Sequence, residues 1–192
     1  MSAFTSAPGA RSRAVRVTRR APRCRTLARS QQTEGSPRVA SIGEALFDCL
    51  ADQRGLSRAE VKSWTPYMGG APLNVVCQTA RLGVPSAFIS AVGEDDLGDK
   101  ILDKARERGI DVRGVQRTAR PTRDIYVIRK MDGDREFAGF GQATEVYADA
   151  HLEATRLPAE VLRSCCVLVT GTLGLAQPAT RQAMLRAVEL VK

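Results

Sequence analysis

Two adjacent glycines followed by an asparagine have the types and spacing best suited to binding a ligand. Gly69, Gly70 and Asn74 stand just before an apolar-periodic run, Val75 to Leu82, that predicts a helix. Because glycine has no Cβ, the backbone can turn sharply and come close to a ligand. The Asn74 amide has two donor hydrogens and one acceptor oxygen, so it can distinguish the hydroxyl groups of a polyol by donating to some and accepting from others. The competing interpretation is a plain loop-to-helix turn, with Pro72 in the first helical turn.

A carboxylate, Asp48, follows the first predicted strand of the body, Val39 to Gly43. In open α/β sheets, ligands gather outside the carboxyl ends of the strands. The sequence therefore predicts that Asp48 holds a substrate hydroxyl. The alternative is a turn-forming aspartate before a polar loop at residues 52–55.

The cysteines and the single histidine, His151, exclude several kinds of chemistry. The five cysteines contain no Cys-x-x-Cys pair, so neither a disulfide framework nor a zinc site is indicated. Cys165 and Cys166 begin an apolar run and are predicted to be small core residues. His151 lies in a polar stretch and is predicted to be on the surface, which leaves a Ser-His-Asp or Cys-His mechanism little to work with.

The positive charge of the chain is concentrated at its N-terminus. Residues 1–36 hold eight Arg and one acid, and so carry +7 of the net charge of +8. The body is therefore nearly neutral, which argues against a basic nucleic-acid-binding face there. No apolar run is long enough to span a membrane, so no membrane partner is expected.

The same N-terminal segment is rich in Arg, Ala, Ser and Thr and has no apolar h-region. This composition predicts an organelle transit peptide over residues 1–36, for the chloroplast in preference to the mitochondrion, with cleavage near Ser30 to Pro37. A basic arm without a targeting role is the competing interpretation.

Alternating strand and helix patterns after residue 37 predict how the candidate site is positioned. Strands are expected at 39–43, 86–92, 110–115 and 167–171, and helices at 75–82, from the acids at 94–96 to Arg108, and at 177–192. The acids at 94–96 suit the positive end of a helix, and Gly109 closes that helix.

A hairpin interrupts this series. One strand is predicted around Ile125 to Ile128 and a second over Arg135 to Phe140, with an Asp132-Gly133 turn between them. A hairpin inserted into a strand–helix series often forms a flap, so we expect this one to be a lid over the site.

The glycine stretch, the box Gly93-Glu94-Asp95-Asp96-Leu97-Gly98 and the Asp-Gly hairpin occur in this order. With them, residues 38–192 resemble the PfkB (ribokinase-like) carbohydrate kinases, and most of all the fructokinases and fructokinase-like proteins of plants and cyanobacteria. The resemblance implies an α/β fold, namely a ribokinase-like doubly wound sheet that is incomplete here, with a small β lid. The chain would then comprise the transit peptide, 1–36, and the N-terminal part of the kinase domain, 37–192, with lid segments near 49–68 and 119–140.

The resemblance also implies a site. Asp48, Gly69, Gly70 and Asn74 would hold the sugar hydroxyls. The opening Gly43-Glu44 with Asp48 is more similar to the fructokinase and 2-keto-3-deoxygluconate kinase subgroup than to ribokinase.

Three departures from the family pattern stand out. Val76 occupies a position where the pattern has a small residue. Residues 141–144, Gly-Gln-Ala-Thr, replace a Tyr-Arg-Asn-Pro segment, so an arginine that would help to hold the sugar is missing. The Gly-Ala-Gly-Asp box, whose aspartate is the catalytic base of the family, does not occur in this sequence.

The resemblance thus implies the sugar-binding part of a kinase that uses ATP with Mg²⁺, and a monovalent cation, to convert fructose to fructose 6-phosphate in the full-length protein. No catalytic, cofactor-binding or metal-binding residue is expected in this chain, which would be a fragment that is inactive alone. The alternatives are a non-catalytic subunit of a plastid transcription complex, with nucleic acid contacted only indirectly, or a kinase for another sugar or nucleoside. The lid would allow a homodimer through Ile125, Val127, Ile128 and Phe137, or would pack on the protein's own sheet.

Overall fold

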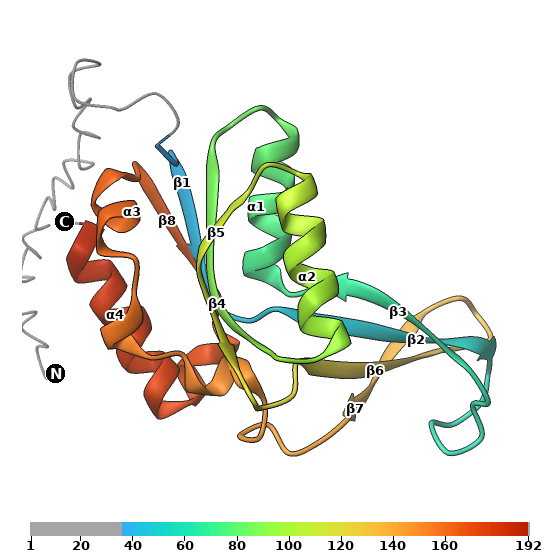
Figure 1. The fold of residues 1–192 in the computed structure, drawn as a ribbon. Coiled ribbons are helices and arrows are strands. Elements are labelled where there is room, and N and C mark those ends of the chain that lie inside the picture. Colours follow the sequence, from blue (N-terminus) through green and yellow to red (C-terminus); the bar gives the residue numbers. More distant parts are fainter. Residues whose placement is uncertain (1–35, 192) are drawn as a thin grey trace, which may run out of the picture.

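The computed structural model describes residues 36–191 of the chain, drawn in colour in Figure 1. These residues form two four-stranded sheets, one parallel and one mixed, and helices that cover the parallel sheet. The predicted transit peptide lies outside the described residues except for Ser36, so its prediction stays open.

The first sheet, sheet A, is parallel throughout and has the strand order β5-β4-β1-β8. Its strands are β1 (Val39–Ile42), β4 (Ser86–Gly93), β5 (Asp111–Thr118) and β8 (Val167–Thr170). Every residue of β4 is buried, as expected for a central parallel strand with both faces covered.

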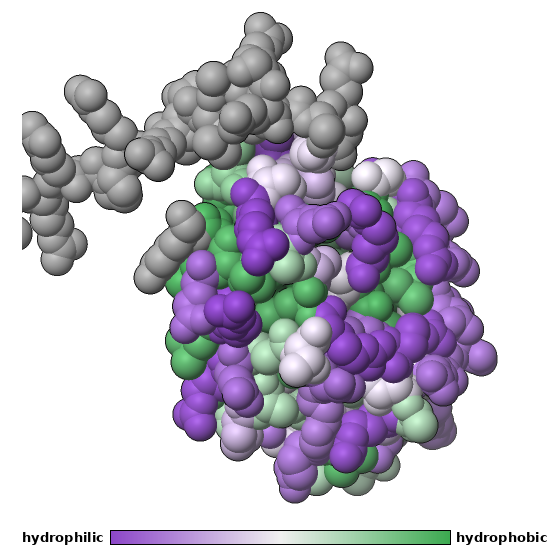
Figure 2. All heavy atoms as spheres, turned by 60° about the vertical axis from the view of Figure 1, so that its left-hand side comes forward, coloured by the Kyte–Doolittle hydropathy of each residue, from purple (hydrophilic) through white to green (hydrophobic). Residues whose placement is uncertain are grey.

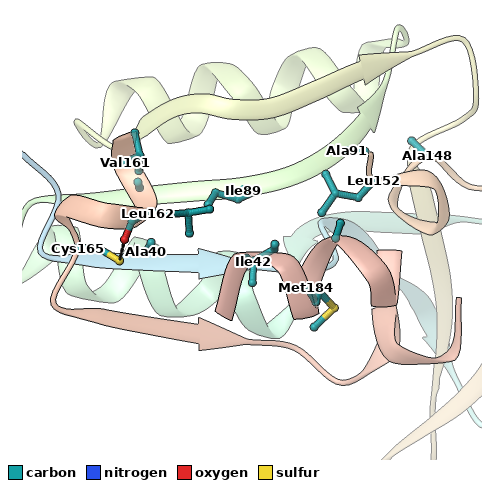
Figure 3. Close-up of a cluster of buried hydrophobic side chains, with 13 residues drawn as sticks. Ala40, Ile42, Ile89, Ala91, Ala148, Leu152, Val161, Leu162, Cys165 and Met184 are labelled. Carbon is teal, nitrogen blue, oxygen red and sulfur yellow. Dashed lines mark hydrogen bonds between the residues drawn. The ribbon is translucent and has the colours of Figure 1, made fainter. Parts of the chain in front are cut away.

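Helices lie on both faces of sheet A (Figure 1). One face carries α1 (Ala71–Arg81) and α2 (Asp96–Glu107), and the other carries α3 (Ala159–Ser164) and α4 (Pro178–Val191). Three short 3₁₀ helices connect the later elements: η2 (Ala148–His151), η3 (Ala154–Arg156) and η4 (Leu173–Ala176). Each face has its own apolar cluster. The cluster under α3 and α4 includes Ile42, Ile89, Leu162 and Met184 (Figure 3).

The second sheet, sheet B, projects from the body of the molecule, to the right in Figure 1. Its order is β3-β2-β6-β7, with β2 (Leu46–Arg54), β3 (Trp64–Gly69), β6 (Arg123–Arg129) and β7 (Arg135–Phe140). β2 and β6 pair in parallel, and the outer pairs are antiparallel. Sheet B is the lid, and it is built from two excursions of the chain.

The predicted α/β class with a small β lid is confirmed, and most elements form close to their predicted positions. The helix predicted from Val75 begins earlier, at Ala71, with Pro72 in its first turn. Between residues 147 and 157 the chain forms the two short 3₁₀ helices η2 and η3. The hairpin turns at Gly133, whose φ of 92° explains the glycine.

Two predictions were wrong. Asp48 was expected at the end of the first strand or, in the alternative, in a turn before a polar loop at 52–55, but Asp48 and residues 52–54 lie within the long lid strand β2. Pairing with β3 and β6 on both sides outweighs the turn preference of its polar residues. The apolar run that predicts the strand at 167–171 is typical of a buried strand, yet β8 is an edge of sheet A, and its Val167 is 48% exposed.

Apolar side chains are also exposed in patches on the side that carries α3 and α4, shown in green in Figure 2. Leu175, Leu185 and Val188 are large apolar residues exposed in this part of the chain. Within residues 36–191, no helix is both long and apolar enough to cross a membrane.

Candidate functional site

The glycine bend joins the lid to the body. Gly69 ends β3, and Gly70 stands just before α1 with a φ of 101°. Both residues are buried. A Cβ on Gly70 would stand 2.7 Å from the backbone oxygen of Glu44, so only glycine fits this conformation and this close approach.

Asp48 lies directly beside this bend. In the register of β2 and β3, Leu46 pairs with Gly69 and Asp48 pairs with Tyr67. A Cβ on Gly69 would collide with the Oδ2 atom of Asp48, so the carboxylate occupies the space next to a bare α-carbon. Burial raises the pKa of the half-buried Asp48, and the positive charge of Arg135 opposes the rise.

Asn74 belongs to the same junction. Its backbone N–H donates to the Gly70 oxygen at 2.9 Å, which places Asn74 in the first turn of α1. Asn74 is exposed. The structure therefore gathers all four predicted sugar-binding residues at the junction between the lid and sheet A, with the Asp48 side chain against Gly69.

Glu44 is a buried acid at this junction to which sequence reasoning gave no role of its own. It is 7% exposed, and its carboxylate lies against Gly171, which follows β8. Burial raises the pKa of Glu44, and a hydrogen bond from the backbone amide of Ala71 opposes the rise. Its Oε2 atom is buried without a hydrogen-bond partner. A charged residue right after a buried strand and a glycine was the available signal.

A buried ion pair, also missed, lies where the second lid excursion begins. Arg123 donates to both carboxylate oxygens of Asp149 through Nε and Nη2, at 2.7 to 3.0 Å, and their side chains are 1% and 3% exposed. Nη2 also donates to the Thr144 oxygen at 3.0 Å. No sequence spacing connects residues 123 and 149, so only the fold reveals the pair.

Residues 141–144, which depart from the family pattern, are fixed by contacts of their own. The Gln142 N–H donates to the hydroxyl of Tyr147 at 2.6 Å, and this hydroxyl donates to Asp124 at 2.8 Å. Burial and the hydrogen bond to Asp124 together raise the pKa of Tyr147 to about 12. Tyr147 is therefore a neutral structural residue at physiological pH.

The box at 93–98 ties the lid to the body. Asp95 caps α2 by accepting from the Gly98 N–H at 2.7 Å. The same carboxylate accepts from the backbone N–H and the hydroxyl of Thr122, both at 2.7 Å. Asp95, one of the acids predicted to suit the helix start, thus also holds Thr122, the residue before β6.

The side chains at this junction offer polar groups of the kind that hydroxyl groups pair with. Asp48 offers acceptors, Asn74 offers donors and an acceptor, and the bend permits close approach. Among residues 36–191, no group of three His, Cys, Asp or Glu side chains could hold a metal ion. The amide of Ala71, at the start of α1, is already engaged by Glu44, so it offers no ready site for a phosphate. We therefore assign no step through ATP or Mg²⁺ to these residues.

The structure is an open α/β sheet with a β lid, and Asp48, Gly69, Gly70 and Asn74 lie at the junction between them. The family described as pfkB family carbohydrate kinase matches residues 36–192. The chain belongs to this family.

Curated relatives agree with this assignment. The chain is 34% identical over 155 residues to fructokinase-1 of Oryza sativa subsp. japonica, which covers 80% of the chain and 47% of the rice protein. It is 33% identical over 159 residues to fructokinase-1 of Zea mays, covering 82% and 48%. The chain therefore spans about half the length of the curated relatives it matches.

Solved structures show the same fold. Fructokinase from Halothermothrix orenii has a TM-score of 0.70 at 25% identity, covering 80% of this chain and 52% of that one. An uncharacterized sugar kinase from Pyrococcus horikoshii, solved in complex with ATP, has a TM-score of 0.71 at 25% identity, covering 80% and 49%. An E. coli protein designated ribokinase II was solved with ATP and Mg²⁺, with a TM-score of 0.73 at 30% identity, covering 81% and 49%.

Proposed function

We propose that this chain is the sugar-binding part of a carbohydrate kinase and that the sugar is fructose. The observation that carries the proposal is the Asp48 carboxylate held against Gly69 at the junction of lid and sheet. Fructokinases are prominent among the relatives, which favours fructose over other sugars. In the complete protein, ATP with Mg²⁺ would supply the phosphoryl group.

Each residue of the site has a proposed role. Asp48 accepts hydrogen bonds from two neighbouring sugar hydroxyls, and Asn74 donates to a third and accepts from it. Gly69 and Gly70 let the sugar approach the backbone. The lid excludes water from the bound sugar, which strengthens these polar contacts.

A binding assay with a panel of ligands tests the proposal. The purified chain is titrated calorimetrically with fructose, glucose, ribose, a nucleoside and 2-keto-3-deoxygluconate. Saturable binding with a preference for fructose supports the proposal, and a preference for another member replaces fructose as the substrate. The absence of binding to any of them contradicts the sugar-site assignment and favours the non-catalytic subunit of a plastid transcription complex.

The chain by itself is proposed to be inactive, because its described residues provide no catalytic base beside a phosphate site. The measurement is ADP release from the purified chain with fructose, ATP and Mg²⁺, with the addition of K⁺. ADP release that requires both the sugar and this chain would show that the catalytic machinery is already present.

The lid is proposed to pair with the lid of a second copy. Val127 and Phe137 are partners on adjacent strands, Ile125 shares their face, and Phe137 is 56% exposed. Ile128 alternates to the opposite face and takes no part. Light scattering of the chain and of Phe137→Ser tests this: a dimer that dissociates in the variant supports pairing, and a monomeric wild-type chain contradicts it.

Residues 1–36 are proposed to direct import into the chloroplast. Their eight Arg and single acid support this proposal. Incubation of the labelled chain with isolated chloroplasts and mitochondria, followed by protease treatment, measures which organelle protects it. Protection in neither, or cleavage far from residues 30–37, contradicts the proposal.

A further inference from the structure

Arg123 is the largest fully buried side chain of the described residues, and it makes contacts in several directions. Besides its two-pronged pairing with Asp149, its guanidinium lies over the ring of Tyr147, 4.6 Å from the centroid, and over the ring of Phe140, 5.4 Å from the centroid. A planar, permanently charged group can make the fork and the ring contacts together, whereas an ammonium cannot.

These contacts join the lid to the body of the protein. Arg123 is the first residue of β6, and Phe140 is the last residue of β7. Asp149 belongs to η2. Ala148, its neighbour in η2, and Leu152, just after η2, are part of the core cluster on sheet A. Both ends of the second lid excursion therefore meet on one guanidinium, which is anchored in the core.

The position of β6 is passed on to Asp48 through strand pairing. Leu46 of β2 pairs with Arg123 on one side and with Gly69 on the other, so these three residues form one row across the lid. Asp48 stands two rows further along β2, on the same face as Leu46, because side chains two residues apart share a face. A shift of Arg123 would therefore tilt the strand that carries Asp48.

We propose that Arg123 is a positioning residue for the sugar site. Its fork to Asp149 fixes the start of β6 on the core, and this sets the orientation of the lid and the place of Asp48 beside Gly69. Arg123 is buried, and the role assigned to it is to position the lid rather than to bind the sugar. The proposal rests on the proposed function for the identity of the ligand, but not for the role in lid orientation.

The chain offers a matched control for the experiment. Arg113 makes the same two-pronged bond to Asp111, with Nε at 3.0 Å and Nη2 at 2.7 Å, but its side chain is 73% exposed and it lies on β5, away from the lid. Arg123→Lys and Arg113→Lys remove the same fork from the two places. Asp149→Asn is a second test variant, which keeps the shape of the side chain and one acceptor oxygen.

Two quantities are measured for each variant of the whole chain: the dissociation constant for fructose, corrected for the folded fraction, and the hydrogen exchange of individual strands. We expect Arg123→Lys to weaken fructose binding about tenfold or more, because displacing a positioned group by about 1 Å is costly. We expect faster exchange in β6 and β7 with unchanged exchange in the central strand β4. Arg113→Lys should change neither quantity.

A merely structural role would give a different pattern. Lower thermal stability with unchanged fructose affinity of the folded fraction and unchanged lid exchange would overturn the proposal. Removing one partner of a buried ion pair is strongly destabilising. If Arg123→Lys and Asp149→Asn accelerate hydrogen exchange in β4 as much as in β6, the ion pair supports the whole domain rather than the lid. That result also overturns the proposal.

Failure of the proposed function gives a distinct result. If the wild-type chain binds no sugar, the proposed function is wrong. The hydrogen exchange of β6 and β7 in the variants still decides whether Arg123 orients the lid. If the wild-type chain binds fructose and both test variants bind it equally well, the positioning role is wrong while the sugar site stands.

Discussion

The carboxylate of Asp48 fills the space that a side chain on Gly69 would occupy. The two residues lie on adjacent antiparallel strands, two rows apart, and the Oδ2 atom would collide with a Cβ on the glycine. The glycine is thus required by its neighbour as much as by the bend that follows it. This contact links the geometry of the bend to the chemistry of the site.

Replacing Gly69 by alanine should harm sugar binding more than stability. The added Cβ would push the Asp48 carboxylate away and would also crowd the Leu46 side chain, 3.2 Å away. We expect fructose affinity to fall about tenfold or more, because a misplaced group loses its hydrogen-bond geometry. Calorimetry and thermal unfolding of Gly69→Ala measure the two effects. Unchanged affinity would show that the carboxylate does not need this position.

Replacing Gly70 by alanine should destabilise the fold. Its φ is 101°, and a Cβ would stand 2.7 Å from the Glu44 oxygen. Strained backbone conformations of this kind cost about 1–3 kcal/mol. Gly133→Ala is the matched control, because Gly133 has a φ of 92° with nothing within 4 Å of the added Cβ. In denaturant unfolding, Gly70→Ala should lose clearly more free energy than Gly133→Ala, and equal losses would refute a role for the close approach.

Fructose binding should weaken in acid. Asp48 accepts hydroxyl hydrogens as a carboxylate, and burial raises its pKa above the ordinary value of 3.8. Affinity should therefore fall as pH falls through that raised pKa, while the wild-type chain remains folded by circular dichroism. A dissociation constant that stays constant down to pH 4 would contradict the assigned role of this carboxylate.

Glu44 should make the fold less stable as pH rises. Burial raises its pKa above the ordinary value of 4.5, so the folded chain holds this proton more tightly than the unfolded chain does. Its contribution is complete below pH 4.5 and is lost as pH rises through the raised pKa. Glu44→Gln should remove this part of the pH dependence of unfolding, whereas Glu107→Gln, at an exposed position, should keep it. Identical profiles for both variants would argue against the buried carboxylate as the source.

The sequence predicted the parts of this structure that depend on local patterns. Two adjacent glycines before a periodic run identified the bend and α1, and Asp132-Gly133 identified the lid hairpin, because turn chemistry and periodicity are local signals. Asp48 was correctly placed beside the bend, but its strand was misplaced. The residues next to Asp48 in the sequence do not indicate that the strand pairs with β3 and β6.

The contacts that hold the site together depend on the fold and were missed. Arg123 and Asp149 are 26 residues apart, and Asp95 and Thr122 are 27 residues apart. In its local sequence, each of these four residues looks like an ordinary charged or polar residue. Only the packing of the lid on the core turns them into buried pairs, and the exposure of β8 follows in the same way from its place at the sheet edge.

The most direct test of the account is the fructose affinity of Asp48→Asn compared with that of Asp52→Asn. Both aspartates lie on β2 with side chains on the same face, but only Asp48 reaches the glycine bend. We predict that the purified Asp48→Asn chain loses fructose binding in calorimetry, because the neutral amide gives up one acceptor and the charge that strengthens both hydrogen bonds. Asp52→Asn should bind as the wild-type chain does. Equal fructose affinity of the two variants would contradict the claim that Asp48 holds the sugar.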